Sequence, residues 1–200
     1  MTRSDSTPRL RLTTTYYVAL VMLTAVVDRP PLTPALDLAV GLVALVLVTF
    51  AALGRIWCSV FIAGRKDTEL VTSGPYALCR HPLYALSLVG GLGLGLATRS
   101  ITLTIVTLVV LGVMFSLAAN LEERVLAERH GSKFSDYAAL VPRWWPRLRN
   151  WHVPTEMHVH PDILWKAFVD AGSFLLLYAL IVAAHAARTA GVTPTLILLP

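Results

Sequence analysis

Five long apolar runs divide the chain, and they constrain its fold more than any other feature. They cover roughly residues 12–27, 35–53, 83–97, 101–121 and 163–187. Only helices and closed barrels satisfy every backbone hydrogen bond within a bilayer, and a helix needs about 20 apolar residues to cross one. Charged residues make up 14% of the chain, against about 25% in soluble domains. The sequence therefore predicts an all-α, polytopic membrane protein with about five transmembrane helices.

Short breaks between the runs predict how the helices connect. Prolines near residue 31 separate the first two runs, so residues 12–53 should form an N-terminal helical hairpin. Only Thr98-Arg99-Ser100 separates the third and fourth runs, which predicts an antiparallel hairpin of residues 83–121. Residues 54–79 should form an ordered loop. Residues 122–130 should extend the fourth helix as far as Gly131, which can end it.

The first apolar run and the C-terminal tail are consistent with this arrangement of helices. The first run follows several arginines but lacks a convincing A-x-A cleavage site, so we expect a retained transmembrane helix rather than a signal peptide. The apolar tail, residues 192–200, is too short to span a membrane. We expect one membrane domain over residues 1–200.

The distribution of Lys and Arg predicts the orientation. With five spans and a cytoplasmic N-terminus, every Lys and Arg lies on the cytoplasmic side except Arg29, Arg99 and Arg188. The start of the third run and the end of the fourth then share the cytoplasmic face. The net charge of +5 does not indicate nucleic-acid binding, because the basic residues are dispersed. They fit topology signals and contacts with anionic membrane lipids better.

Titratable side chains stand at these two hairpin ends. Arg80 and His81 precede the third run, and Glu122 and Glu123 follow the fourth. Charged groups are expensive at membrane depth and persist where they have a partner or a task. An arginine fork matches a carboxylate, and a glutamate can hold an ammonium, so the four groups together suit a zwitterion such as S-adenosylmethionine. The simpler alternatives are interface anchors and a solvated helix face. Aromatic residues that could line an adenine site are Tyr84, Tyr137 and Trp144.

Three sequence blocks carry a more specific signal. They are Ser73-Gly74-Pro75-Tyr76-Ala77-Leu78-Cys79-Arg80-His81-Pro82-Leu83-Tyr84, then Glu122-Glu123-Arg124-Val125-Leu126, then His130-Gly131 with Phe134, Tyr137, Val141-Pro142-Arg143 and Pro146. In this order they resemble the isoprenylcysteine carboxyl methyltransferase and phospholipid methyltransferase superfamily. The resemblance covers roughly residues 54–146, which would form the methyltransferase core. Residues 147–200 would add an interfacial loop, the fifth span and the tail.

The resemblance implies an integral-membrane enzyme that binds S-adenosylmethionine at its cytoplasmic face and takes a lipophilic acceptor from the bilayer. It implies that the cofactor is bordered by Arg80, His81, Tyr84, Glu122, Glu123, Tyr137 and Arg143. Family members often carry an arginine four residues before the Glu pair, where this chain has Ala118. The methylated atom of the acceptor (O, N or S) and the oligomeric state stay open.

Methyl transfer from a sulfonium is an in-line displacement that needs alignment and exclusion of water, and no metal. Where the acceptor carries a proton, His81 and Glu123 are the candidate bases. Asn120 either reaches the acceptor or makes a hydrogen bond between helices. Two rival functions remain at this stage. One is a non-catalytic, lipid-binding membrane protein, and the other is a small transporter on the same fold.

Other polar and small residues have structural explanations. Gly91 and Gly95 have the spacing that lets membrane helices approach closely, which we favour over a nucleotide loop. Asp170, in the fifth run, is expected to pair with Lys166 one turn away. Cys58 and Cys79 are expected to be unpaired thiols.

Residues 142–154 are rich in Trp and Pro, which favours an interfacial belt over a substrate platform. A polar loop is favoured over a metal site for His152, Glu156, His158 and His160.

Overall fold

A computed structural model describes residues 7–28, 32–63, 69–148, 151–155, 159, 161–193 and 197–198. The long helices are α1 (Thr7–Val26), α2 (Pro34–Ile62), α4 (Pro82–Ala97), α5 (Ile101–His130) and α7 (Pro161–Thr189). Two short helices, α3 (Pro75–Leu78) and α6 (Ser132–Leu140), lie in the connections. The two-residue strands β1 (Val27–Asp28) and β2 (Ile197–Leu198) pair in parallel. The predicted all-α class is confirmed.

Three of the described helices are long and apolar enough to cross a membrane: Pro34–Ile62, Ile101–His130 and Leu164–Thr189. The apolar part of α1, Thr13–Val26, and α4 are shorter. These five apolar helices correspond to the five runs of the sequence.

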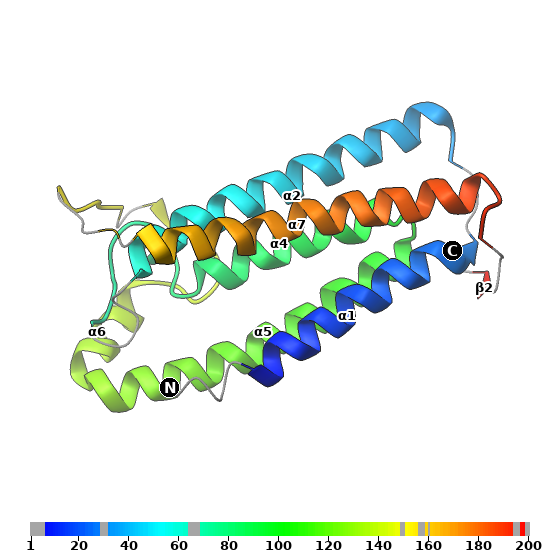
Figure 1. The fold of residues 1–200 in the computed structure, drawn as a ribbon. Helices are drawn as coiled ribbons and strands as arrows, with labels where there is room; N and C mark the ends of the chain where they lie inside the picture. Colours follow the sequence, from blue (N-terminus) through cyan, green and yellow to red (C-terminus); the bar gives the residue numbers. More distant parts are fainter. Residues whose placement is uncertain are drawn as a thin grey trace.

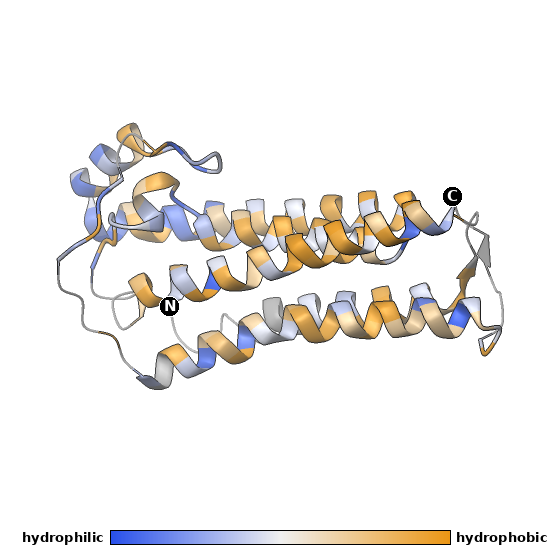
Figure 2. Ribbon diagram, turned by 90° about the horizontal axis from the view of Figure 1, so that it is seen from above, coloured by the Kyte–Doolittle hydropathy of each residue, from blue (hydrophilic) through white to orange (hydrophobic). Residues whose placement is uncertain are grey.

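The long helices form one elongated bundle in which successive members run in opposite directions (Figure 1). Helix α4 lies between α2 and α5, and α7 packs on α1 and α2. The core includes Leu20, Val48, Leu94, Leu111 and Ile181, one from each long helix. Helices α2 and α5 end, and α4 and α7 begin, at the same end of the bundle. Hydrophilic residues gather at that end, where α6 and the loops lie (Figure 2).

Glycines let α4 approach its neighbours, as their spacing predicted. A Cβ at Gly95 would lie 2.8 Å from the Cα of Thr104, and one at Gly91 would lie 2.4 Å from a methyl of Leu111, both on α5. The turn between α4 and α5 is closed by Arg99, whose φ is 61°. The Nε of Arg99 donates to Asp37 Oδ1 on α2 at 2.6 Å.

Two sequence predictions about elements were wrong. Helix α2 continues through residues 55–62, where a loop was expected, because Gly54 does not break the helix but makes room for the side chain of Leu86. Asp170 pairs with Arg55 of α2 instead of Lys166. The reason is that α7 packs directly on α2 and brings Asp170 within reach of the partly buried Arg55. Helix α4 begins at Pro82, and α5 continues to His130 as predicted, ending at Gly131 with a φ of 55°.

Candidate active site

The start of α4 is held by a segment that is distant in sequence. The backbone N–H groups of Arg80 and His81 donate to the carbonyls of Pro142 at 2.9 Å and Arg143 at 3.3 Å. The N–H of Arg147 donates to Leu78 O at 3.0 Å. These bonds fix the residues just before α4, so that Arg80 and His81 face the end of α5.

One carboxylate oxygen joins the two ends of the α4–α5 hairpin. Glu123 Oε1 accepts from Arg80 Nε at 3.0 Å and lies 2.9 Å from His81 Nε2. Arg143 Nε lies 3.3 Å from the same oxygen. The Nη1 of Arg80 also donates to Ala138 O of α6 at 2.8 Å. Arg80 and Glu123 therefore tie α4, α5 and α6 together at one point.

His81 is almost fully buried and stands between the two glutamates. Burial lowers the pKa of its imidazole, and this outweighs the hydrogen bond to Glu123 and the charges of both carboxylates, which raise the pKa. Because an ionised carboxylate only accepts, we assign the ring proton to Nε2, facing Glu123. The lone pair on Nδ1 then faces Glu122, whose Oε2 is 3.8 Å away.

An aromatic stack leads from His81 into the bundle. The Tyr84 ring stacks on His81 at 5.6 Å and on Phe115 of α5 at 5.3 Å. Trp144 lies against another side of His81 at 5.9 Å. The imidazole is therefore fixed in position by rings as well as by Glu123.

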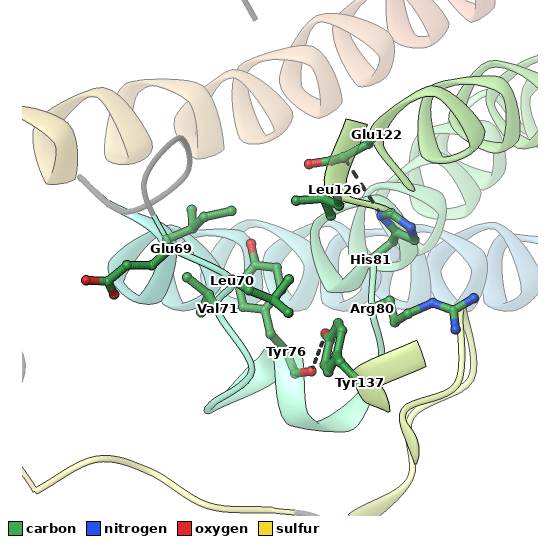
Figure 3. A pocket seen from close by; sticks show the side chains of 10 residues that line it. Glu69, Leu70, Val71, Tyr76, Arg80, His81, Glu122, Leu126 and Tyr137 are labelled. Atoms are coloured by element: carbon green, nitrogen blue, oxygen red, sulfur yellow. Dashed lines mark hydrogen bonds and ion pairs between the residues drawn. The ribbon is translucent and has the colours of Figure 1, made fainter. Parts of the chain in front are cut away.

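A small pocket opens beside His81 (Figure 3). It encloses about 40 Å³, room for about three water molecules. Its lining residues are Ile62, Glu69, Leu70, Val71, Tyr76, Arg80, His81, Glu122, Leu126 and Tyr137. The walls thus combine apolar side chains with acidic, basic and aromatic groups.

Two tyrosines at this pocket differ in their hydrogen bonding. The hydroxyl of Tyr137 donates to the carbonyl of Tyr76 at 2.7 Å. The hydroxyl of Tyr76 is buried and has no hydrogen-bond partner among the residues that the structure describes. Burial raises the pKa of both phenols, so both stay protonated and can donate.

A second polar contact lies on the other side of Glu123. Arg143 donates to the side-chain oxygen of Asn120 on α5, and its guanidinium lies over the Trp144 ring at 5.7 Å. The hydrogen bond of Asn120 therefore links α5 to the segment that contains Arg143, and Asn120 is not part of the pocket lining.

The structure brings all the candidate residues into one contact network, but only some of them reach the pocket. Its lining includes Arg80, His81, Glu122 and Tyr137. The others surround that lining: Tyr84, Asn120, Glu123 and Arg143.

The residues that sequence reasoning missed at the site include Glu69, Tyr76 and Phe115. Tyr76 lies within the first of the three sequence blocks, so its position in that block was a usable signal. Glu69 and Phe115 have no sequence pattern that marks them.

Among the described residues, the cysteines form no disulfide and the metal-ligating side chains form no cluster. Cys58 and Cys79 are free and buried, and burial raises the pKa of the Cys79 thiol to about 11. The described residues contain no group of three or more His, Cys, Asp or Glu side chains that could hold a metal ion. Three residues of the histidine-rich loop, Glu156, His158 and His160, lie outside the described residues.

Comparisons with known proteins point to one family. A family model described as phospholipid methyltransferase matches residues 34–133. A nickel-cobalt-cadmium resistance protein, NccN, from Alcaligenes xylosoxydans xylosoxydans is 40% identical over 153 residues, which cover 76% of this chain and 71% of that protein. A cobalt-zinc-cadmium resistance protein, CzcN, from Cupriavidus metallidurans is 38% identical over 145 residues, covering 72% and 67%. No solved structure matches the chain significantly.

Proposed function

The chain belongs to the phospholipid methyltransferase family of membrane proteins, and we propose that it transfers a methyl group from S-adenosylmethionine to a lipophilic acceptor. One observation carries the proposal. Arg80 and His81, from the start of α4, and Glu122, from the end of α5, line the same small pocket. Both signs of charge thus meet where the two helix ends converge.

The polar and apolar groups that line the pocket fit S-adenosylmethionine. Glu122 offers a carboxylate to an ammonium or a sulfonium, whereas the exposed Glu69 carboxylate points away from the other lining residues (Figure 3). The buried hydroxyl of Tyr76 lacks a partner among the described residues and can donate to a ligand. Leu70, Val71 and Leu126 supply apolar walls for an adenine ring.

Binding requires the pocket to widen. A volume of about 40 Å³ holds only a few waters, whereas pockets for drug-sized ligands measure about 300 Å³ or more.

When bound, S-adenosylmethionine supplies an electrophilic methyl group on a sulfonium. The residues of the chain align the two reactants and keep water out. Where the acceptor carries a proton, the Nδ1 atom of His81 is placed to take it, because Nε2 is engaged by Glu123. The lowered pKa of His81 keeps this nitrogen unprotonated at neutral pH.

We also propose that the site faces the cytoplasm. The uneven distribution of Lys and Arg supports this, because cytoplasmic connections carry an excess of positive charge.

A radiolabelled methyl-transfer assay tests the proposed reaction. Purified protein, labelled S-adenosylmethionine and a total lipid extract should give label in the organic phase. The Glu122→Ala variant should lose that label, and the Glu128→Ala variant should keep it, because Glu128 is exposed on the same helix. Absence of label with every lipid fraction would contradict the proposal.

The rival functions give different results. A non-catalytic lipid-binding protein binds the extract and transfers no label. A transporter produces substrate flux in proteoliposomes without methyl transfer. The names of the two relatives supply a cellular readout. If the chain contributes to metal tolerance through methylation, expression should raise growth in cadmium or cobalt, and His81→Ala should abolish the gain.

A further inference from the structure

Two ion-pair clusters mark the ends of the apolar part of the bundle. At the site end, Arg55 of α2 pairs with Asp170 of α7. At the far end, Asp37 of α2 pairs with Arg99, and His185 of α7 lies 3.8 Å away. At 1.5 Å per residue the clusters are about 27 Å apart along α2 and about 22 Å apart along α7. No charged residue lies between them on either helix. This spacing is close to the hydrocarbon thickness of a bilayer, about 30 Å.

The same rise per residue, applied to α5, places the candidate site at the level of the lipid headgroups. Helix α5 starts beside Arg99, at the far boundary. Glu122 follows Ser100 by 22 residues, which corresponds to about 33 Å of helix. The glutamates therefore lie just beyond the hydrocarbon, together with His81, which contacts them.

The segment of residues 140–148 is attached to the site at this depth. Its backbone bonds to Leu78, Arg80 and His81 hold it there. Three of its large apolar side chains point outward all the same. Leu140 is 67% exposed, Trp145 is 83% exposed and Leu148 is 78% exposed.

The charge of this segment favours one type of partner. Residues 140–148 contain two arginines and no acidic residue, and Arg147 is exposed. Tryptophan prefers the membrane interface, and basic side chains bind anionic headgroups. Exposed apolar side chains next to arginine, at headgroup depth, match an anionic lipid surface.

We propose that Leu140, Trp145 and Leu148 insert into the headgroup–acyl boundary of an anionic leaflet, while Arg147 contacts lipid phosphates. This interaction goes beyond methyl transfer and does not depend on it. Because the inserted segment is hydrogen-bonded to the residues that precede α4, contact with the lipid holds the site at the depth where the polar end of a lipid arrives.

Site-directed spin labelling tests the insertion. Both native cysteines are buried, so a new surface cysteine can be labelled selectively. Labels at Trp145→Cys and Leu148→Cys, in nanodiscs with about one third anionic lipid, should be accessible to oxygen and shielded from a water-soluble nickel complex. Glu128→Cys serves as the aqueous control and Val109→Cys, on the apolar face of α5, as the lipid control.

The charge contribution is tested in the same system. Neutral nanodiscs, and Arg147→Glu in anionic ones, should both raise nickel accessibility at position 145. Binding of S-adenosylhomocysteine, measured in parallel, reports whether the variants remain folded. It also tests the methyltransferase proposal independently of the lipid contact.

Three results would overturn the proposal. The label at 145 could be as accessible to nickel as the label at 128. Its depth could be independent of both lipid charge and Arg147. Its spectrum could show dipolar broadening that grows with the number of protein copies per disc, which would assign the surface to a second copy of the chain.

Discussion

Glu122 and Glu123 are neighbours in sequence, yet their surroundings differ. Glu123 is occupied by Arg80, His81 and Arg143. Among the described residues, the only ion pair found for Glu122 is the 3.8 Å approach to His81, and its side chain lines the pocket. Glu123 therefore holds the helix ends together, while Glu122 is the carboxylate that the proposed function assigns to the ligand.

The hydroxyl of Tyr76 should have opposite effects on stability and on ligand binding. Tyr76→Phe removes a buried donor without a described partner, so the ligand-free protein should gain about 1 kcal/mol. If the hydroxyl bonds the ligand, affinity for S-adenosylhomocysteine should fall about fivefold. Thermal denaturation in detergent and calorimetry measure the two effects. A gain in stability with unchanged affinity would remove Tyr76 from the binding site.

Acid should destabilise the protein through His81. Burial lowers the pKa of this imidazole below its usual 6.5. Above pH 6.5 the group is neutral in both the folded and the unfolded chain, and its contribution is fully present. As the pH falls below 6.5 the unfolded chain takes up the proton first, so stability is lost until the folded pKa is reached.

Thermal midpoints between pH 7.5 and 5 check this contribution of His81. The His81→Gln variant should show a shallower decline than the wild-type protein. Parallel declines would mean that His81 does not contribute in this range.

The sequence predicted which residues belong to the site better than it predicted where their side chains lie. Arg80, His81 and Glu122 were identifiable because charges at helix ends in a membrane are few. Arg143 was expected to border the cofactor, and its side chain contacts Glu123 and Asn120 outside the pocket lining. The wall formed by residues 69–71 was not predicted, because a connection between helices has no periodic pattern that could mark it.

Among the elements, α4 and α5 depend on glycine for their packing. Gly95→Ala would place a methyl group 2.8 Å from the Cα of Thr104, a backbone atom that cannot move aside. We expect a loss of about 1–3 kcal/mol in thermal denaturation. Gly112→Ala on α5 is the matched control, since nothing described lies within 4 Å of its Cβ position. Equal effects of the two variants would contradict this packing argument.

Helix α7 should be coupled to α2 and α4 through Arg55. This arginine pairs with Asp170 and also donates to Ser87 and Leu83 O on α4. Asp170 is half exposed, so we expect a coupling energy of about 1–2 kcal/mol, below the range for fully buried pairs. A double-mutant cycle of Arg55→Met and Asp170→Ala measures it. Additive effects would show that the Arg55–Asp170 pair does not hold α7 against α2.

Hydrophobic runs predicted the number and the order of the long helices, but not all of their limits. The sequence predicted a loop that starts at Gly54, whereas the lack of a side chain there serves packing against Leu86. The Asp170 pair was assigned to a neighbour on the same helix, because partners on another helix cannot be identified from one-dimensional spacing.

At the scale of the whole molecule, the bundle separates an apolar body from one polar end (Figure 2). Helices of alternating direction place the start of α4 and the end of α5 at that end, together with α6 (Figure 1). Under the proposed function, a membrane-embedded acceptor and a water-soluble methyl donor would meet at the boundary between the two, and the pocket lies at the polar end of the bundle.

Calorimetric titration of S-adenosylhomocysteine into the protein in nanodiscs tests the central claim most directly. The wild-type chain and Glu128→Gln should bind alike. Glu122→Gln should lose about tenfold or more in affinity, because a charge-assisted hydrogen bond is worth about 1.5–3 kcal/mol. Absence of binding by the wild-type chain, or equal affinity of Glu122→Gln and Glu128→Gln, would contradict a cofactor site between the ends of α4 and α5.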